Sequence, residues 1–363
     1  MNTPCLFGLN RTNRDFTQRE TWGKNQFNSS FPAALCCYLA SKFYMKCVDL
    51  FSGCGGLSLG FQQAGLDVVA AFDHWQPAID VYQQNFSHPV FNQDLSNEKE
   101  SIDKIKEFAP DIIMGGPPCQ DFSSAGKRDV TQGRADMTCH FANIVCALKP
   151  KWFVMENVEQ IKKSHILADV IDQFDKVRYG LTSMILDASF CGVPQSRTRF
   201  FLLGILNGPH HQLDGIIKKN LAKKQMTIRD YLGNKLGLEV YYRHPRNYNR
   251  RGVFTIDEPS PTVRGVNRPV PKGYKLNTCD PDHVDLKNVR PLTTIERSYI
   301  QKFPSDFKFF GTKTNLEQMI GNAVPVNLGT FIANAIQEYS QTGAVKTSLF
   351  DEWRPFELSM QCA

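Results

Sequence analysis

Short apolar runs alternate with helix-like stretches over residues 46–205 of this 363-residue chain. The runs have the length and the β-branched or aromatic character of strands, and they are KCVDLF (46–51), LDVVAAF (66–72), DIIMG (111–115), WFVMEN (152–157) and RFFLLGI (199–205). The stretches between them, such as LSLGFQQAG (57–65), repeat apolar residues with a helical period. This alternation predicts an α/β fold, with a doubly wound, mostly parallel sheet and helices on both of its faces.

Glycines and polar residues follow the ends of these predicted strands. The glycine-rich segment 53–56 follows the first run, Asp73 follows the second, Cys119 comes shortly after DIIMG, and Glu156 lies at the end of WFVMEN. In doubly wound sheets, ligands bind in the crevice at the carboxyl ends of the strands. We therefore expect these residues to share one site.

The composition changes after about residue 206, where the alternation stops. Residues 206–251 contain ten Lys or Arg against three Asp or Glu, a local excess of +7, whereas the whole chain carries +6. The stretch YYRHPRNYNRRG (241–252) interleaves aromatic residues with cations. Such a stretch can hold phosphates and stack on bases, although a solvated basic loop is the alternative. We interpret this region as a smaller, inserted domain that binds nucleic acid.

The segment DLFSGCGG (49–56) places a glycine-rich turn between a strand and a helix. Glycines at such a turn let the backbone approach a ligand closely, and Asp73 is placed to accept hydrogen bonds from ribose hydroxyls. The segment lacks both GxGxxG and the Lys of a phosphate-binding loop, which disfavours a nucleoside triphosphate. It predicts a nucleoside-bearing cofactor, with a tight turn and a surface Asp as the alternative.

Cys119 follows two prolines, Pro117 and Pro118, and precedes the loop-like segment QDFSSAGKRD (120–129). The prolines fix the backbone, so the thiol can be aimed, and a thiolate is a strong nucleophile. Glu156 in MENV (155–158) would be an adjacent proton donor. The alternatives are a Cys that acts as a small hydrophobic residue and a Glu that caps the next helix.

Six sequence blocks occur in one order: DLFSGCGGLSLGF (49–61), GGPPCQDFS (115–123), ENV (156–158), QSRTR (195–199), RPLTTIERSYIQKFP (290–304) and IGNAVPVNLG (320–329). In this order they resemble the cytosine-5 DNA methyltransferases of the bacterial or phage modification type, over nearly all of residues 46–340. The resemblance implies an S-adenosylmethionine-dependent, Rossmann-like catalytic domain with an inserted DNA-recognition domain.

The resemblance also implies a mechanism and its catalytic residues. Cys119 would attack carbon 6 of a cytosine flipped out of the duplex, and Glu156 would hold ring nitrogen 3 and assist its protonation. Carbon 5 would then take the methyl group of S-adenosyl-L-methionine. Arg197 would hold the cytosine and help to position the site, while Arg199 would support the loops by hydrogen bonding.

Cofactor contacts are implied for residues in several of these blocks. Asp73 would bind the ribose, Asp94 the adenine amino group, and His74 or Trp75 would cover the adenine ring. The remaining expected cofactor residues are Phe51, Gly53, Gly55, Gly56, Leu95, Pro118, Asn322 and Val324. The expected DNA-contacting residues are Ser123, Lys127, Arg199, Arg243, Arg246, Arg250, Arg251 and Thr262.

The chain is expected to comprise five parts. These are an N-terminal extension that contributes little to the core (1–44, with Met45 as an alternative start), a catalytic and cofactor-binding domain (45–205), a small target-recognition domain (206–317), a returning segment (318–342) and a tail (343–363). The apolar run FPAALCCYLA (31–40) is too short to span a bilayer. The 11 cysteines show no zinc-binding spacing, which predicts free thiols in a reducing cytoplasm and no metal.

The expected substrate is double-stranded DNA, and we expect a monomer that acts in a bacterial or phage-infected cytoplasm. It would be either the partner of a restriction endonuclease with the same recognition site or a solitary methylase. A transfer RNA methyltransferase on the same scaffold is a rival reading, but the Cys-Phe-Thr signature of that branch is absent from the sequence. A catalytically silent DNA-binding regulator is the other rival, and the joint presence of Cys119, Glu156 and Arg197 disfavours it.

Overall fold

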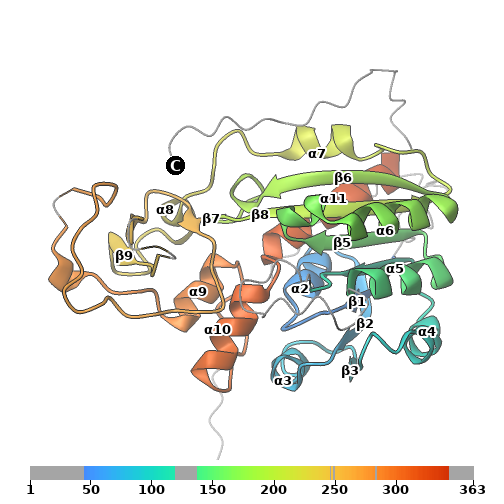
Figure 1. Ribbon diagram of the computed structural model, residues 1–363, viewed down its shortest axis with the longest axis horizontal. Helices are drawn as coiled ribbons and strands as arrows, with labels where there is room; N and C mark the ends of the chain where they lie inside the picture. The colour runs from blue at the N-terminus through green and yellow to red at the C-terminus, as the bar shows by residue number, and fades with distance from the viewer. Residues whose placement is uncertain (1–44, 119–136, 246, 248–249, 283, 343–363) are drawn as a thin grey trace, which may run out of the picture. The chain divides into compact units, whose positions relative to one another are not determined.

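The computed structural model describes residues 45–118, 137–245, 247, 250–282 and 284–342, all of which belong to one unit, Tyr44–Ala363. Its centre is a seven-stranded sheet with the order β3-β2-β1-β4-β5-β8-β6 (Figure 1). The strands are β1 (Lys46–Leu50), β2 (Asp67–Asp73), β3 (Val90–Asn92), β4 (Ile112–Gly115), β5 (Trp152–Asn157), β6 (Tyr179–Asp187) and β8 (Thr198–Leu206).

The strand directions confirm the predicted mostly parallel sheet. Strands β3, β2, β1, β4 and β5 pair in parallel, whereas β8 runs antiparallel to both of its neighbours, β5 and β6. A connection of only ten residues, 188–197, returns the chain from β6 into β8. Because such a short link allows only a reversal of direction, β8 must run antiparallel to β6.

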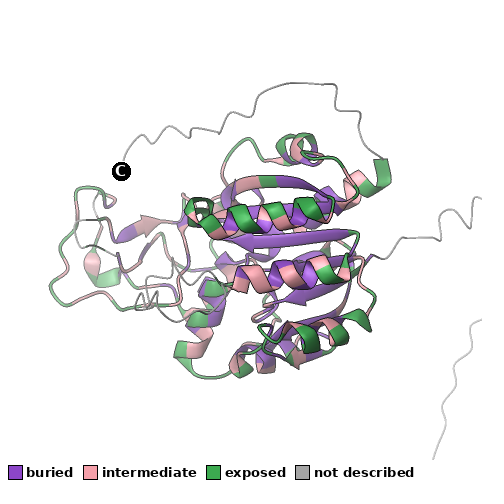
Figure 2. Cartoon of the chain, turned by 45° about the vertical axis from the view of Figure 1, so that its right-hand side comes forward, coloured by how far each residue is buried: buried purple, intermediate pink, exposed green. Residues whose placement is uncertain are grey.

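Side chains along each strand point alternately to the two faces of the sheet. Ile112, Met114, Trp152 and Val154 enter one apolar cluster, whereas Ile113 and Phe153 enter the other. The strands are therefore buried on both faces, as the purple strands of Figure 2 show. This two-sided burial explains why the predicted strands appear as continuous apolar runs rather than as alternating ones.

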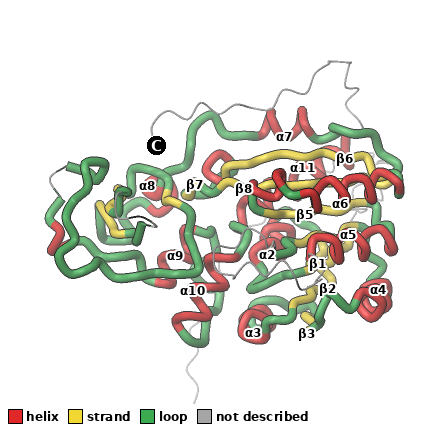
Figure 3. Tube along the Cα trace, viewed as in Figure 1, coloured by secondary structure: helices red, strands yellow, loops and turns green. Residues whose placement is uncertain are grey.

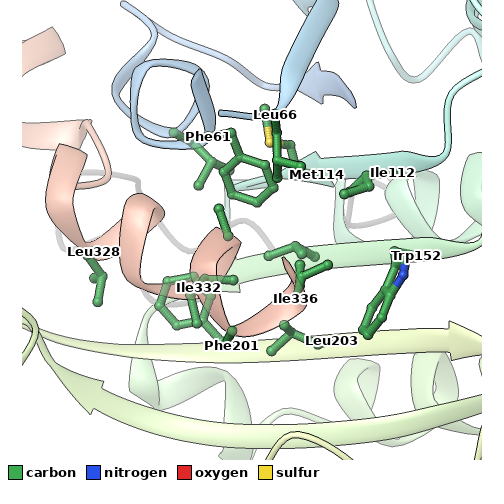
Figure 4. Close-up of a cluster of buried hydrophobic side chains, with 14 of the residues drawn as sticks. Phe61, Leu66, Ile112, Met114, Trp152, Phe201, Leu203, Leu328, Ile332 and Ile336 are labelled. Atoms are coloured by element: carbon green, nitrogen blue, oxygen red, sulfur yellow. The ribbon is translucent and has the colours of Figure 1, made fainter. Parts of the chain in front are cut away.

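Helices cover both faces, as a doubly wound fold requires. The first face carries α2 (Gly56–Gln63), α3 (Gln76–Gln83), α7 (Asp214–Asn220) and α11 (Val326–Thr342). The second carries α4 (Glu98–Lys106), α5 (Met137–Leu148) and α6 (His165–Lys176). Figure 4 shows the first cluster, in which Phe61 of α2 and Ile332 and Ile336 of α11 meet Met114 and Leu203 of the sheet.

The region after α7 has little regular structure and is mostly loop in Figure 3. Its elements are α8 (Ile228–Leu232), β9 (Val240–Tyr242), β10 (Val253–Thr255), β11 (Ser260–Pro261), a 3₁₀ turn (Leu286–Asn288), α9 (Thr294–Ile300) and α10 (Lys313–Asn322). Strands β9 and β10 form an antiparallel pair, and β11 pairs in parallel with β7 (Gln195–Ser196). This last pair joins the region to the segment that leads into β8.

The segment 313–342, which includes α10 and α11, is long and apolar enough to cross a membrane by length and composition alone. However, 67% of its apolar window is buried inside the protein. Leu328, Ile332 and Ile336 lie in the first cluster with no exposed surface. The apolar character of this segment is therefore explained by its packing in the core.

Helices α2 and α11 pack closely because glycines face each other across the contact. A Cβ atom on Gly60 would overlap the Val326 carbonyl oxygen and lie 2.8 Å from the Thr330 nitrogen. The Thr330 hydroxyl donates a hydrogen bond to the Gly60 carbonyl at 3.0 Å. The close packing of α11 against α2 therefore requires glycine, which has no side chain, at position 60.

We expect Gly60→Ala to lower the free energy of unfolding by about 1–3 kcal/mol, because the added methyl group forces the two helices apart. Gly215→Ala in α7 is the matched control, since a Cβ there meets nothing within 4 Å. That change should be neutral or stabilise by up to about 1 kcal/mol. Denaturant unfolding measures both variants, and equal stabilities would refute the packing role of Gly60.

Candidate active site

The loop after β1 has an unusual backbone that opens a space above the sheet edge. Phe51, Gly53 and Gly55 have φ angles of 59°, 54° and 92°, in the left-handed region that favours glycine. A Cβ atom on Gly53 would meet nothing within 4 Å, so open space borders the backbone there. A ligand can therefore approach the main chain closely at this loop.

Asp73 at the end of β2 holds this loop in place. Its Oδ2 accepts a hydrogen bond from the Gly53 N–H at 2.7 Å, and its Oδ1 accepts one from the Trp75 N–H at 2.8 Å. The carboxylate thus connects the loop after β1 to the loop after β2. A contact between Asp73 and a ribose stays a prediction, and it would use the lone pairs that these two bonds leave.

The returning chain closes one side of the loop. A Cβ atom on Gly56 would overlap the Val324 carbonyl oxygen, so only glycine fits at this position. Val324 is buried in the turn between α10 and α11, and Asn322, the last residue of α10, is exposed. Val324 therefore lies beside the glycine-rich loop, whereas a contact of Val324 or Asn322 with the cofactor stays a prediction.

The other predicted cofactor residues lie at the ends of β2 and β3. The His74 side chain is 75% exposed and lies beside Asp73, while Trp75 packs partly against the cluster beneath α9 and α10. Asp94 accepts hydrogen bonds from the amide and the hydroxyl of Ser96, which hold the pKa of its carboxyl below the usual value. Leu95 is buried. The His74 and Trp75 rings thus lie in different settings, the first exposed and the second partly packed.

The chain that leads to Cys119 is anchored beside Glu156. The Asn157 amide donates a hydrogen bond to the Pro117 carbonyl at 3.1 Å, and a Cβ atom on Gly116 would lie 3.1 Å from Oε2 of Glu156. Pro118 is exposed at the end of this described segment. Cys119 itself lies outside the described residues, as do Ser123, Lys127 and Arg246.

Glu156 forms an ion pair with Arg199 across the β5–β8 ladder. Arg199 Nε lies 2.9 Å from Glu156 Oε1, and the two side chains are 15% and 11% exposed. Because Glu156 pairs with Phe201 in the register, Arg199, two residues away, projects to the same face. The pair leaves the second carboxylate oxygen, Oε2, toward Gly116.

Arg197 lies in the interior rather than against Glu156. It is 2% exposed, and its Nη1 donates hydrogen bonds to the carbonyls of Val263 and Gly321, each at 3.1 Å. Burial lowers the pKa of its guanidinium, and the charge of Arg199 adds to this effect. We expected Arg197 to hold the cytosine, and that role stays a prediction; the described contacts of its Nη1 join the link between β7 and β8 to the chain after β11 and to α10.

Two glutamines from the blocks QSRTR and RPLTTIERSYIQKFP, to which the sequence analysis assigned no role, complete this junction. Gln195 Nε2 donates to Gln301 Oε1 at 2.6 Å, and Gln195 Oε1 accepts from the Val263 N–H at 2.8 Å. Gln301 Nε2 in turn donates to the carbonyls of Ile320 and Ala323. Both side chains are fully buried, so the network fixes the turn that carries Asn322.

The predicted DNA-contacting residues lie in different settings. Thr262 Oγ1 donates to the Ser196 carbonyl at 2.9 Å, and Arg243 Nη2 donates to the Thr262 carbonyl at 3.0 Å. Arg250 is exposed. Arg251 forms an ion pair with Glu258, and its guanidinium also lies 4.2 Å from the Phe254 ring centroid.

Arg264 and Arg268, which the sequence analysis did not single out, join Arg243 around His244. Arg264 Nη2 donates to the His244 carbonyl, and Arg268 is exposed. Partial burial and the charges of these three arginines lower the pKa of the His244 imidazole. A positive potential therefore gathers at this point, next to the Thr262–Val263 segment that binds β7.

Among the described residues, no group of three or more His, Cys, Asp or Glu side chains is arranged to hold a metal ion. The site consists instead of a carboxylate–guanidinium pair, an open glycine-rich loop and a cluster of arginines. These groups suit a positioned proton transfer, a nucleoside-bearing ligand and a polyanion, respectively.

We expect Arg197→Met to lower the free energy of unfolding by about 2–5 kcal/mol, because the Val263 and Gly321 carbonyls would lose a buried, charged donor. Arg250→Met is the control, since Arg250 is exposed, and it should change stability by less than about 0.5 kcal/mol. Thermal unfolding followed by circular dichroism compares them. A fully stable Arg197→Met protein would contradict the junction role of Arg197.

Comparisons with known proteins identify the family of this chain. Residues 45–338 match the C-5 cytosine-specific DNA methylase family. The chain is 69% identical to type II methyltransferase M.HindV of Haemophilus influenzae over 297 residues, which are 82% of this chain and 98% of that protein. It is 53% identical to M.HgiDI of Herpetosiphon aurantiacus over 295 residues, 81% and 95% of the two chains.

Among solved structures, the Dnmt2 methyltransferase of S. pombe superposes with a TM-score of 0.60 and 19% sequence identity, and the match covers 81% of this chain and 99% of that one. At this identity the likeness supports the fold alone. The family match and the identity to M.HindV go further, because they extend over most of both chains. The chain therefore belongs to the C-5 cytosine-specific DNA methylase family and is a DNA (cytosine-5-)-methyltransferase.

Proposed function

We propose that this enzyme is the modification methyltransferase of a type II restriction-modification system. It would methylate carbon 5 of one cytosine within a specific sequence of double-stranded DNA, and a companion restriction endonuclease would cut the same sequence when it is unmethylated. M.HindV and M.HgiDI are both named type II methyltransferases. Because one chain supplies both the Glu156–Arg199 pair and the recognition region, we propose that it acts as a monomer in the cytoplasm.

The Glu156–Arg199 pair is the observation that carries the catalytic proposal. Its second carboxylate oxygen faces Gly116, three residues before Cys119, and Asn157 holds the intervening Pro117 carbonyl. The Cys119 thiolate attacks carbon 6 of the cytosine, and Glu156, which hydrogen-bonds ring nitrogen 3, takes up a proton and passes it to that nitrogen as negative charge develops there. Carbon 5 thereby becomes nucleophilic. After methylation, water takes the carbon-5 proton, and the electron pair of that bond re-forms the carbon 5–carbon 6 double bond while the Cys119 thiolate leaves carbon 6.

Arg199 takes the positioning role that the sequence suggested for Arg197. Its guanidinium fixes the rotamer of Glu156 and keeps one carboxylate oxygen occupied, so that the other faces the reacting base. The cytosine must leave the base stack to reach this pair, at a cost of a few kcal/mol. Phosphate contacts elsewhere on the protein offset that cost.

The enzymes of this family use S-adenosyl-L-methionine, which supplies the methyl group on a positively charged sulfur. The residues present fit such a group, because the loop at Phe51 and Gly53 borders open space and the end of β2 lies beside it. We propose that Phe51, Gly53 and Gly55 line the cofactor and that Asp94 binds its adenine. Asn322 and Val324 would close the pocket from the returning segment.

The recognition region would begin after α7 rather than at residue 206. Leu213, Ile216 and Ile217 pack in the first core cluster with α11, so α7 is part of the catalytic domain. Within the recognition region, we assign DNA contact to Arg243, Arg250, Arg264 and Arg268 and to Thr262. Arg251 is assigned a structural role, because its guanidinium is bound to Glu258.

DNA from a host that expresses the chain should contain 5-methylcytosine at one defined sequence, and bisulfite sequencing would locate it. Cys119→Ser should abolish the modification, because a hydroxyl is a far weaker nucleophile than a thiolate, while S-adenosyl-L-methionine binding is largely retained. A duplex with 5-fluorocytosine at the target should trap a covalent adduct with the wild-type enzyme. Robust turnover by Cys119→Ser, or no adduct at a methylated site, would refute the mechanism.

Arg264→Gln and Arg268→Gln should each weaken duplex binding. A contact to phosphate would also reduce the slope of log K against log salt by about 1, whereas a contact to a base edge would relax the sequence preference. Arg229→Gln is the control, because Arg229 is bound to Asp257 and Glu239. Salt-dependent binding assays on specific and unrelated duplexes distinguish these results, and unchanged binding would place the DNA surface elsewhere.

A further inference from the structure

A buried carboxylate lies beneath the glycine-rich loop and has no role in the chemistry proposed above. Asp49, in β1 and two residues before Phe51, is 1% exposed. Its Oδ2 accepts a hydrogen bond from the Ser58 hydroxyl of α2 at 2.6 Å. Its Oδ1 is buried and has no hydrogen-bond partner among the described residues. A carboxylate in this state is costly unless it is protonated or a cation approaches it.

A chain of hydrogen bonds leads from Asp49 toward the surface. The Tyr82 hydroxyl of α3 donates to Ser58 Oγ at 2.7 Å and lies 2.6 Å from Nε2 of the half-buried His88. The Gln62 amide lies 3.5 Å from Nδ1 of His88. Because the single Tyr82 proton points to Ser58, Nε2 of His88 carries the other proton. All donors in the chain therefore point toward Asp49.

The groups that face Asp49 favour its protonated form. Burial raises the pKa of Asp49 to about 7, and the nearby Asp73 carboxylate of β2 raises it further, although the Ser58 hydrogen bond opposes this. Burial also raises the pKa of Cys47 on β1 and of Tyr82 on α3, so both stay neutral at pH 7. Burial lowers the pKa of His88 to about 4, so its imidazole is neutral too.

No cationic side chain thus stands among the groups that face Asp49 in the described structure. The loop that Asp49 precedes is the one assigned above to a cofactor with a positive sulfur. We propose that Asp49 supplies the negative charge for that sulfonium: it ionises and releases its proton to the solvent when S-adenosyl-L-methionine binds, and the donors of Ser58, Tyr82 and His88, which point toward it, stabilise the carboxylate. The inference rests on the proposed cofactor site.

The same residue would distinguish the methyl donor from the product. Once the methyl group has left, the sulfur of S-adenosylhomocysteine is a neutral thioether, and it no longer favours an ionised carboxylate. Asp49 then recovers its proton, which weakens the hold on the product relative to the donor. Asp49 is therefore a residue that sets the preference for the donor over the product, not a catalytic residue.

Calorimetry of the wild-type enzyme in buffers of different ionisation enthalpy tests this proposal. S-adenosyl-L-methionine binding at pH 7 should release about half a proton, and its affinity should rise on the order of tenfold between pH 6 and pH 8, because Asp49 must ionise. S-adenosylhomocysteine binding should release much less. Asp49→Asn should remove the release and leave only the titration of the cofactor's own amine.

Two further variants distinguish an effect on the ionisation of Asp49 from a loss of folding caused by the Asp49→Asn substitution. Ser58→Ala removes a bond that lowers the pKa of Asp49, so it should move the midpoint of the affinity profile to higher pH. Tyr179→Phe is the control, since it also removes a buried tyrosine hydroxyl bond, to Pro150, and should change nothing. Equal proton release by Asp49→Asn, or none by the wild type, would overturn the inference. A failure of the wild type to bind S-adenosyl-L-methionine would instead refute the cofactor site.

Discussion

The hydrogen bonds around the buried guanidinium of Arg197 join three parts of the chain that are distant in sequence. Nη1 binds the carbonyls of Val263 and Gly321, while the neighbouring Gln195 binds the Val263 amide and the Gln301 side chain. Movement of any of the three parts would break buried hydrogen bonds, two of them to a charged donor, so this site tolerates little displacement. Because Arg199, in β8, lies two residues after Arg197, the same junction also fixes the ion pair with Glu156.

Much of the fold could be predicted from the sequence, because strands buried on both faces of a sheet appear as apolar runs. The five predicted runs correspond to β1, β2, β4, β5 and β8. The direction of β8 could not be predicted, because it depends on which strand lies beside it and not on its own residues. Similarly, α7 follows the end of the alternation at about residue 206, yet it packs with α11, which follows more than a hundred residues later.

The contacts of single side chains in the site likewise could not be predicted from the sequence alone. The motif QSRTR contains two arginines, and only the register with β5 decides that Arg199 faces Glu156. Arg264 and Arg268 lie outside the stretch in which cations and aromatic residues alternate, so their meeting with Arg243 at His244 had no local signal. Arg251 lies inside that stretch but is bound to Glu258. Charge counts locate a basic region, whereas the ion pair of Arg251 with Glu258 can be seen only in the structure.

The glycine-rich loop combines two constraints that act on the same atoms. Asp73 binds the Gly53 and Trp75 amides with its carboxylate and so keeps its charge close to the loop. That charge, together with burial, raises the pKa of Asp49 below the loop. The Asp73 carboxylate, which holds the loop, therefore disfavours ionisation of Asp49 until a cation binds nearby. If Asp73 were neutral, Asp49 would ionise more readily in the empty enzyme, and less of its charge would depend on the sulfonium. Asp73 thus shapes the loop, and the proposed preference for a positively charged ligand would follow from the same pair of carboxylates.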